Sequence, residues 1–403
     1  MKCLTFGKYW LSLIGIVAPV ALMAQNVTAE SAIAIDGSSG KILYRRNMDE
    51  ELYPASTTKV MTALLLLEHC DPNEIIIAPA DVNKVKEASM HLKPFEHVRA
   101  KDMLYAMLLR SANDGCYAVA VHLAGSQAKF SDMMNARAKE LGCTHTHFDN
   151  PNGLNDRMHY TTAHDLALIA REAMRYPLFR DTVRTERTTI NRGINWKDTI
   201  MVNHNKILRR DPTCDGIKTG WTIPAGHCFV GTASREGWRV ITVVLKSKSW
   251  ENDTEALFNY SFGEYIKRDE VASGQPVGVA PVENGAAAQV AMVAGDDAYT
   301  LTRRTDTPTS DHRIVVLPKL TAPIEKDQKL GDLQIRDGDG FEQDVPLVAG
   351  AALPLSHLAA VKKSGSNGNL WMGAGLVVGA IWIRGRSRRR YLRAPTRIKV
   401  RVR

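Results

Sequence analysis

A serine and a lysine stand three residues apart at the start of the apolar stretch "PASTTKVMTALLLLEH", residues 54–69. Helical spacing puts Ser56 and Lys59 on one face, with their Cβ atoms about 5–6 Å apart. A serine hydroxyl becomes a nucleophile when a base takes its proton, and a neutral lysine can be that base. Burial and a second cation both lower the pKa of a lysine. The pair therefore predicts a nucleophile, Ser56, activated by a base, Lys59.

The S-x-x-K pattern is weak when it stands alone, because it also occurs at Ser38–Lys41 and Ser126–Lys129. Two further motifs, Ser111-Ala112-Asn113 and Lys218-Thr219-Gly220, each occur once. Each has a purely structural interpretation: a helix break with capping residues for the first, and a turn with a charged flank for the second. All three motifs in this order are hard to obtain by chance, so together they indicate one site.

The elements that must position these motifs can be read from periodicity and turn residues. The pattern predicts strands over 32–46, helices over 54–69, 100–111, 114–124, 126–141 and 161–174, a β-hairpin over 228–247, and a helix over 251–267. The order indicates a sheet covered by helices, with a helical subdomain inserted between strands. Short alternating stretches with Asn-Gly and Asp-Gly turns then predict a small all-β domain over 273–357.

The three motifs resemble those of the low-molecular-mass penicillin-binding proteins, specifically the serine-type D-alanyl-D-alanine carboxypeptidases. That superfamily has S-x-x-K, S-D-N and K-T-G, and Ala112 stands here in place of the central Asp. Supporting stretches are "SAIAIDGSSGKILY", "LLRSAND", "THFDNPNGL", "TTAHDLALIAREAM", "GIKTGWTIPAGHC" and "KLTAPIEKDQKLGDLQI". The resemblance covers about residues 30–357. It implies an α/β (α+β) fold of the serine β-lactamase/transpeptidase type: a mainly antiparallel sheet flanked by helices, a helical subdomain, and a C-terminal β-sandwich domain.

The resemblance also implies how the motif residues act. Ser56 attacks the carbonyl of the penultimate D-alanine of a peptidoglycan stem peptide and forms an acyl-enzyme, with Lys59 as the base. Ser111 relays a proton to the leaving D-alanine, and Asn113 holds the substrate amide. The charge of Lys218 helps to keep Lys59 neutral.

The remaining implied roles concern binding of the substrate terminus. Lys218 and Thr219 bind the terminal carboxylate, and Gly220 lets the substrate backbone approach the strand. The backbone N–H groups of Ser56 and Trp221 form the oxyanion hole. The expected function is removal of the terminal D-alanine from pentapeptide stems, with β-lactam antibiotics as inhibitors.

Other activities share these motifs and stay open at this point. A class A β-lactamase needs a glutamate-bound water, and no E-x-x-L-N segment supplies it here. A transpeptidase differs only in using an amine instead of water, and a DD-endopeptidase acts on existing cross-links. A wall-binding module without activity would need a broken motif, and none is broken. One departure from the family is Phe95 in "LKPFEHV", where a type II turn would favour Gly.

The cysteines and histidines predict neither a disulfide framework nor a metal site. Five cysteines follow the leader-like segment: Cys70, Cys116, Cys143, Cys214 and Cys228. An odd number in an exported chain excludes complete pairing. Cys116 and Cys143 are expected to be buried thiols, whereas pairing of Cys214 with Cys228 stays open. His145 and His147 lack further ligands at metal spacing, so no metal or other cofactor is predicted.

Both ends of the chain resemble targeting segments. Lys2 and Lys8 precede an apolar run, and small residues precede Glu30, so residues 1–29 predict a signal peptide. A catalytic domain over 30–270, the β-domain over 273–357 and a linker over 358–369 follow. The stretch "LWMGAGLVVGAIWI", residues 370–383, predicts a membrane anchor, although its length leaves open whether it spans the bilayer.

The charge of the chain is concentrated in its tail. Residues 384–403 contain ten basic residues and no acid, and residues 1–29 carry +2 of the net charge of +9, so residues 30–383 carry −3. Residues 30–383 therefore lack the excess of positive charge that is typical of nucleic-acid-binding proteins. Basic residues after an apolar segment are typical of a cytoplasmic end. We therefore expect an exported protein, anchored by its C-terminal segment to the outer face of the bacterial cytoplasmic membrane. The sequence predicts no oligomeric state.

Overall fold

The computed structural model describes residues 27–359 and 399–400, in two compact units. The expected anchor, most of the expected signal peptide and most of the basic tail lie outside these residues. One unit ends at Glu264 and the other begins at Tyr265. This division precedes the expected boundary because Tyr265–Val271 forms β10, which pairs with β13 (Ala298–Arg303) of the second unit. Within the described ranges, no helix is long and apolar enough to cross a membrane.

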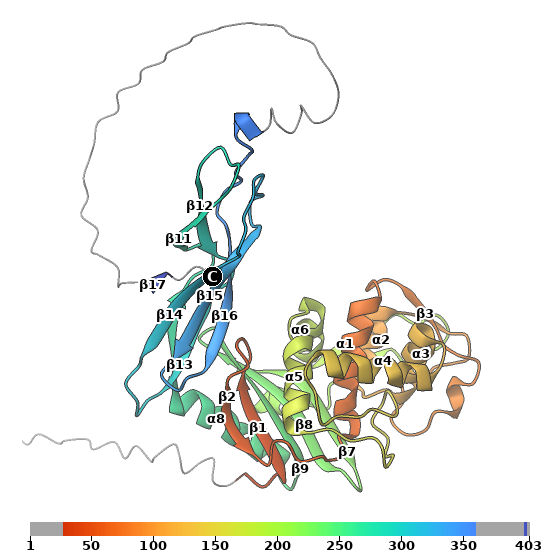
Figure 1. The fold of residues 1–403 in the computed structure, drawn as a ribbon. Coiled ribbons are helices and arrows are strands. Elements are labelled where there is room, and N and C mark those ends of the chain that lie inside the picture. Colours follow the sequence, from red (N-terminus) through yellow and green to blue (C-terminus); the bar gives the residue numbers. More distant parts are fainter. Residues whose placement is uncertain (1–26, 360–398, 401–403) are drawn as a thin grey trace, which may run out of the picture. The chain divides into compact units, whose positions relative to one another are not determined.

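The first unit is built on a five-stranded sheet (Figure 1). Its strand order is β2 (Ile42–Arg46), β1 (Ser31–Asp36), β9 (Trp238–Ser247), β8 (Gly226–Arg235) and β7 (Cys214–Thr222). Every neighbouring pair is antiparallel. Most of the helices are inserted between β2 and β7, so strands from before and after this insertion share one sheet, and the predicted antiparallel sheet is confirmed.

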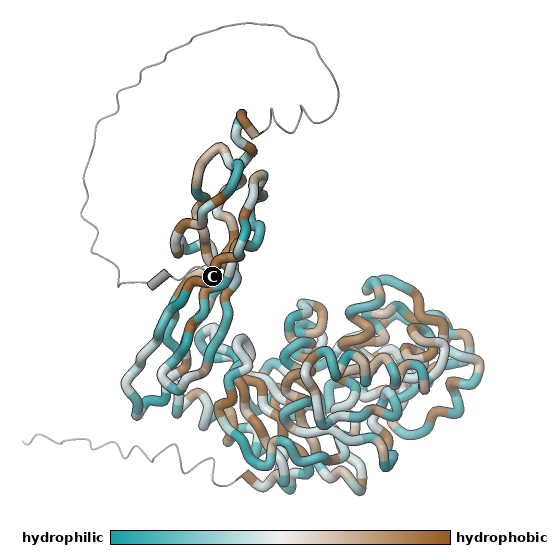
Figure 2. The backbone as a smooth tube through the Cα atoms, viewed as in Figure 1, coloured by the Kyte–Doolittle hydropathy of each residue, from teal (hydrophilic) through white to brown (hydrophobic). Residues whose placement is uncertain are grey.

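The two faces of the sheet pack on different helices because side chains alternate along a strand. On one face, Ile33 and Val243 belong to the main core together with residues of α1 (Lys59–His69) and α5 (Ala163–Ala173). On the other, Phe229 and Val244 pack with Trp250 of α8 (Trp250–Glu264). Figure 2 shows hydrophobic residues along these strands and helices, and hydrophilic residues in the surrounding loops. Both faces are buried, which makes the sheet a rigid support.

The inserted segment contains most of the helices, and Figure 1 shows several of them beside the β7 edge of the sheet. After α1 come α2 (Ala100–Leu109), α3 (Asn113–Ala124), α4 (Gln127–Glu140), α5, α6 (Pro177–Val183) and α7 (Ile207–Arg210). Two short ribbons accompany them, β3 (Ile75–Ile77) with β4 (His97–Arg99), and β5 (Arg187–Thr189) with β6 (Ile200–Val202). The helical subdomain predicted from the sequence is thus present.

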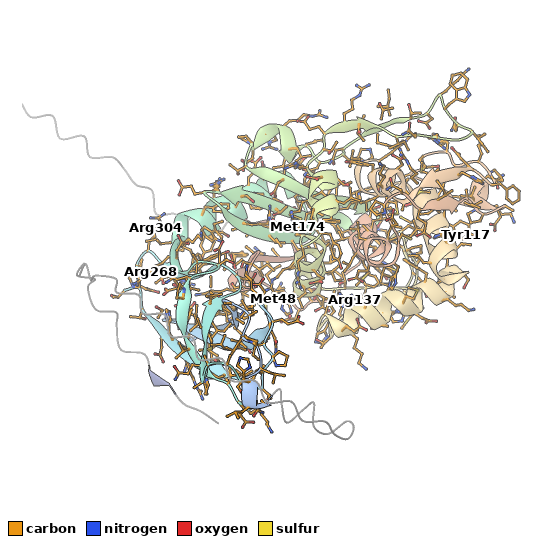
Figure 3. The ribbon with its side chains drawn as sticks, turned by 90° about the horizontal axis from the view of Figure 1, so that it is seen from above. Met48, Tyr117, Arg137, Met174, Arg268 and Arg304 are labelled. Carbon is orange, nitrogen blue, oxygen red and sulfur yellow. The ribbon has the colours of Figure 1, made fainter. Side chains whose placement is uncertain are left out.

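Helix α1 is the centre of this subdomain. Its residues 59–66 are all buried, and α2, α3, α4 and α5 pack around it. Arg137 of α4, labelled in Figure 3, donates to Glu68 of α1 at 2.7 Å. Ser126 accepts from the backbone N–H of Lys129 at 3.3 Å and caps α4, so this S-x-x-K pair is a helix start. The first turn of α1 therefore lies in a tightly packed environment.

The second unit is all-β, as predicted. Its larger sheet has the order β11 (Pro276–Pro281), β12 (Gln289–Ala294), β16 (Glu342–Ala349), β15 (Lys329–Asp337), β14 (Ser310–Val316) and β17 (Lys399–Val400). Only the β14–β17 pair within it is parallel. Alternating residues of β15, such as Leu333 and Ile335, form its core with Leu347. The unit thus has a hydrophobic core of its own.

Candidate active site

Ser56 and Lys59 are in direct contact. Ser56 lies in a 3-10 turn, Ala55–Thr58, and α1 begins only at Lys59, later than the predicted start at residue 54. The Nζ of Lys59 donates to Ser56 Oγ at 2.9 Å and to the backbone carbonyl of Asn152 at 2.6 Å. The Lys59 side chain is fully buried. The nucleophile and its base are therefore placed by local spacing, and the base is held by a segment about ninety residues away in sequence.

The segment that supplies the Asn152 carbonyl is a loop fitted against this turn. Thr62 Oγ1 of α1 donates to the Pro151 carbonyl at 2.6 Å. Gly153 has φ +86°, and a Cβ on it would lie 1.8 Å from the carbonyl oxygen of Ala55. Only glycine fits there. The stretch "DNPNGL" belongs to the family resemblance, but the sequence analysis assigned it no role. Its Asn-Pro-Asn-Gly composition is typical of a tight loop and was the only local indication of one.

Ser111 lies between α2 and α3, as the helix-break pattern predicts, and Asn113 is the first residue of α3. Ser111 is buried and has φ +65°, an uncommon conformation for a non-glycine residue. Asn113 Nδ2 donates to the Lys86 carbonyl at 3.2 Å, and Asn113 N donates to the Ala88 carbonyl at 2.7 Å. Asn113 Oδ1 is buried and has no hydrogen-bond partner. A buried acceptor without a partner is costly, so this oxygen suits a donor on a ligand.

Asp114 completes "SAND" and fixes the loop that holds Asn113. Its carboxylate accepts from Ser89 Oγ at 2.6 Å, from Met90 N at 3.0 Å and from Leu92 N at 2.9 Å. Charge-assisted hydrogen bonds of this kind are stronger than neutral ones. The fourth residue of the motif thus acts on the loop and only indirectly on the site.

The Lys218-Thr219-Gly220 motif lies on the edge strand β7. Lys218 is buried, and its Nζ donates to the Thr219 carbonyl at 3.0 Å. A Cβ on Gly220 would lie 3.0 Å from Ser56 N and 3.1 Å from Thr57 N. The glycine therefore makes room for the backbone of the nucleophile itself. The sequence analysis had expected it to make room only for the backbone of the substrate.

One cavity joins the three motifs. It has a volume of about 290 Å³. Of the predicted site residues it is lined by Ser56, Ser111, Asn113, Thr219, Gly220 and Trp221, and the lining also includes Glu87, Asn152, His204, Lys206 and His227. Lys59 and Lys218 do not line it, because both are buried in its wall. Sequence analysis missed Glu87, His204 and His227, which lie in no local pattern that distinguishes them from other surface residues.

The two lysines have lowered pKa values. Burial lowers the pKa of Lys59 to about 8. Burial, and then the charge of Lys59, lower the pKa of Lys218 to about 7. Glu87 and Asp114 support the charge of Lys59 and not that of Lys218. Both lysines thus hold their protons less tightly than a lysine in water, and the charge of one lowers the pKa of the other.

The cavity rim carries an aromatic pair and a histidine. Trp221 is 57% exposed, and its ring centroid lies 6.3 Å from that of His227 on the paired strand β8. Burial lowers the pKa of His204, and the charges of Lys218 and Arg110 lower it further. The β7–β8 side of the cavity is thus aromatic, and the imidazole of His204 favours its neutral form.

The cysteines and Phe95 were also the subject of sequence expectations. The five cysteines of the described region are free thiols, so Cys214 and Cys228 are unpaired, and Cys116 and Cys143 are buried as predicted. Phe95 has φ +61° in a turn closed by a 3.0 Å bond from Glu96 N to the Lys93 carbonyl. It occupies the type of turn position that favours glycine.

The comparisons with known proteins agree with this geometry. Residues 18–249 match the family of D-alanyl-D-alanine carboxypeptidases, and residues 265–354 match the C-terminal domain of penicillin-binding protein 5. The chain is 32% identical over 330 residues to D-alanyl-D-alanine carboxypeptidase DacF of Bacillus subtilis, covering 80% of this chain and 85% of DacF. It is 29% identical over 377 residues to DacC of Escherichia coli, covering 88% and 91%.

A solved structure shares the fold as well. The peptidoglycan synthesis regulatory factor PBP3 of Streptococcus pneumoniae superposes with a TM-score of 0.70 at 26% identity, covering 81% of this chain and 99% of that protein. The family match covers more than half of the 403 residues and includes Ser56, Ser111 and Lys218. The catalytic fold is that of the penicillin-binding proteins, and this chain belongs to the D-alanyl-D-alanine carboxypeptidase family.

Proposed function

We propose that the protein is a serine carboxypeptidase that removes the terminal D-alanine from peptidoglycan stem peptides ending in D-Ala-D-Ala, through an acyl-enzyme on Ser56. The observation that carries this proposal is the 2.9 Å bond between Lys59 Nζ and Ser56 Oγ beside a cavity lined by all three motifs. Neutral Lys59 accepts the Ser56 proton as Oγ attacks the carbonyl of the penultimate D-alanine. The peptide C–N bond then breaks, the leaving amine takes a proton through Ser111, and water hydrolyses the ester.

Binding of the substrate's terminal carboxylate acts on the lysine pair. Thr219 lines the cavity, and Lys218 lies behind it. A terminal carboxylate bound there favours the charged form of Lys218 and raises its pKa. A charged Lys218 then disfavours a proton on Lys59, which keeps the base neutral for acylation. The substrate itself thus sets the protonation state that acylation needs.

The other site residues have roles that follow from their positions. The unpartnered Oδ1 of Asn113 accepts an N–H of the substrate peptide. The backbone N–H groups of Ser56 and Trp221 donate to the oxyanion, because β7 lies against the Ser56 turn. Trp221 adds an apolar rim over the departing residue.

Measuring free D-alanine released from a synthetic pentapeptide tests the activity, and mass spectrometry of a penicillin adduct tests the nucleophile. Ser56→Ala should abolish both release and labelling. Ser126→Ala is the matched control, since it removes the serine of another S-x-x-K pair that only caps α4. Labelling that survives Ser56→Ala, or an adduct on another serine, contradicts the assignment.

The same assay separates the related activities. Adding glycine as an amine acceptor gives a peptide product if the enzyme is a transpeptidase, whereas a carboxypeptidase releases only the shortened stem. A cross-linked dimer as substrate reports DD-endopeptidase action. A long-lived penicillin adduct distinguishes the proposed enzyme from a β-lactamase, which would regenerate free Ser56 quickly.

Export and anchoring complete the proposal. The protein acts outside the cytoplasm, after removal of residues 1–29, and is held on the cytoplasmic membrane by residues 370–383. The charge pattern at both ends of the sequence supports this arrangement. A chain that ends at Lys363 should stay soluble on cell fractionation and still bind penicillin. Retention of that shortened chain in the membrane after a high-salt wash would place the anchor elsewhere.

A further inference from the structure

Three metal-binding side chains meet at the end of α1 that lies away from Ser56. The ligand atoms of Cys70, Glu74 and His122 all lie within 4.8 Å of one another. Cys70 is the C-cap of α1, Glu74 directly precedes β3, and His122 is in the last turn of α3, the helix that carries Tyr117 in Figure 3. We propose that these residues bind one Zn²⁺ ion, with a water molecule as fourth ligand. This proposal does not depend on the proposed function.

The donor set and the geometry fit this ion. A thiolate, an imidazole nitrogen and a carboxylate oxygen are the ligands that zinc prefers, in tetrahedral arrangement. Zinc–ligand bonds of about 2.0–2.3 Å place neighbouring ligand atoms roughly 3.3–3.6 Å apart. His122 Nε2 and Glu74 Oε1 are 2.9 Å apart, so the ion would enter between two groups that now share a hydrogen bond. Movements of about 1 Å by these side chains complete the site.

The backbone around the site is fixed while the side chains keep room to move. Cys70 N donates to the Leu66 carbonyl at 3.0 Å, Glu74 N to the Asp71 carbonyl at 2.9 Å, and Ala100 N to the Glu74 carbonyl at 2.8 Å. The side chains of Glu74 and His122 are 41% and 24% exposed. An ion therefore has access from solvent, and binding requires side-chain rotation without a rearrangement of the chain.

Binding must displace a proton. Burial and the neighbouring Glu74 raise the pKa of Cys70 to about 11, and Cys70 binds a metal only as a thiolate. Zn²⁺ replaces that proton: the S–H bond breaks, an S–Zn bond forms, and one H⁺ is released to solvent. His122 would contribute a lone pair of its imidazole, and Glu74 a carboxylate oxygen. Affinity should therefore fall as the pH falls.

The consequence of binding follows from which helices it joins. Helix α1 begins at Lys59 and α3 begins at Asn113, and the two helices pack against each other. Cys70 and His122 lie at the opposite ends of these same helices. Eleven residues of helix put the ion about 16 Å from Lys59, too far for contact with the substrate. The ion would clamp the two helices whose first turns carry catalytic motifs, and act on stability.

The test uses the full chain in detergent, fully reduced and without a histidine tag. Titration with Co²⁺ should give one equivalent of a sulfur-to-cobalt charge-transfer band with the d–d absorption of a four-coordinate site, and Zn²⁺ should abolish both. Cys70→Ser should remove the charge-transfer band, and His122→Ala should weaken binding at least about tenfold. His69→Ala is the matched control, because His69 is exposed beside Cys70 but outside the group; it should leave the titration unchanged.

Thermal melting provides an independent measurement. Saturating Zn²⁺ should raise the Tm of the unaltered chain by a few degrees and should not raise the Tm of Cys70→Ser, because a ligand that binds only the folded state stabilises it. Comparable circular dichroism of the variants at low temperature shows that they fold. Absence of the thiolate band from the unaltered chain, or its persistence in Cys70→Ser, overturns the proposal. Penicillin labelling of Ser56 is expected to be the same with and without zinc.

Discussion

Gly220 lies against the backbone of Ser56 so closely that a Cβ on it would be 3.0 Å from the Ser56 nitrogen. The position of the nucleophile is therefore set from two sides. Its own chain places it one turn before Lys59, and the neighbouring strand β7 limits where that turn can lie. The same strand carries Lys218, so a shift of β7 would change both the nucleophile and the carboxylate site.

Gly220→Ala should slow acylation by penicillin, because the added Cβ pushes the Ser56 turn back by a few tenths of an ångström. A displacement near 1 Å of a reacting group costs about 100-fold, so the expected loss is smaller than that. Stopped-flow measurement of adduct formation gives the rate. Gly193→Ala is the control, since a Cβ there would meet its nearest atom, the His97 carbonyl oxygen, at an ordinary 3.4 Å. Equal acylation rates for the two variants would show that the close approach does not matter.

Acylation should rise with pH as Lys59 loses its proton, with a midpoint near pH 8. The sign follows from its role, since only the neutral amine can accept the Ser56 proton. Lys59→Arg should abolish acylation at every pH, because arginine stays protonated. Measurement of the rate of adduct formation at intervals of roughly one pH unit, from about pH 5 to about pH 10, checks the pH dependence and the effect of Lys59→Arg. An acylation rate that does not fall at acid pH would contradict the role of Lys59 as the base.

Lys218→Met should raise the free energy of unfolding at pH 7 by roughly 2–4 kcal/mol while substrate turnover is lost. The folded state lowers the pKa of Lys218 to about 7, so its proton is bound more weakly in the folded than in the unfolded chain. The lysine thus costs stability at and below pH 7, and the cost fades as the pH rises toward 10.5.

Urea unfolding of Lys218→Met at pH 7 and pH 10 checks this sign, since the gain should shrink at the higher pH. Lys248→Met is the matched control, because it makes the same substitution at an exposed lysine of the same unit. It should change stability by no more than about 0.5 kcal/mol. A loss of stability in Lys218→Met at pH 7 would mean that its burial is not a cost.

Phe95→Gly should be more stable than Phe95→Ala by about 1 kcal/mol. Both variants lose a ring that is 64% exposed, but only glycine accepts φ +61° without strain. Comparing the two variants removes the contribution of the ring, which a comparison with the unaltered chain would include. Equal denaturant midpoints would show that the turn relaxes in solution.

The chemistry of the first motif was contained in the sequence because it is local. Three residues separate Ser56 and Lys59, and any helical turn brings such side chains together, so the 2.9 Å contact needed no knowledge of the fold. The helices after residue 100 and the β8–β9 hairpin were equally accessible, since their apolar residues repeat with the period of the element itself.

What lay beyond the sequence were contacts between distant segments. The Asn152 carbonyl on Lys59, the fit of Gly220 against Ser56 and the meeting of Cys70 with His122 join residues that no periodicity relates. The lowered pKa values of the two lysines depend on burial and on which charges surround each ammonium group. Local spacing thus determined which groups take part, whereas packing decided their neighbours, because burial and charge depend on distances in space that the order of residues does not specify.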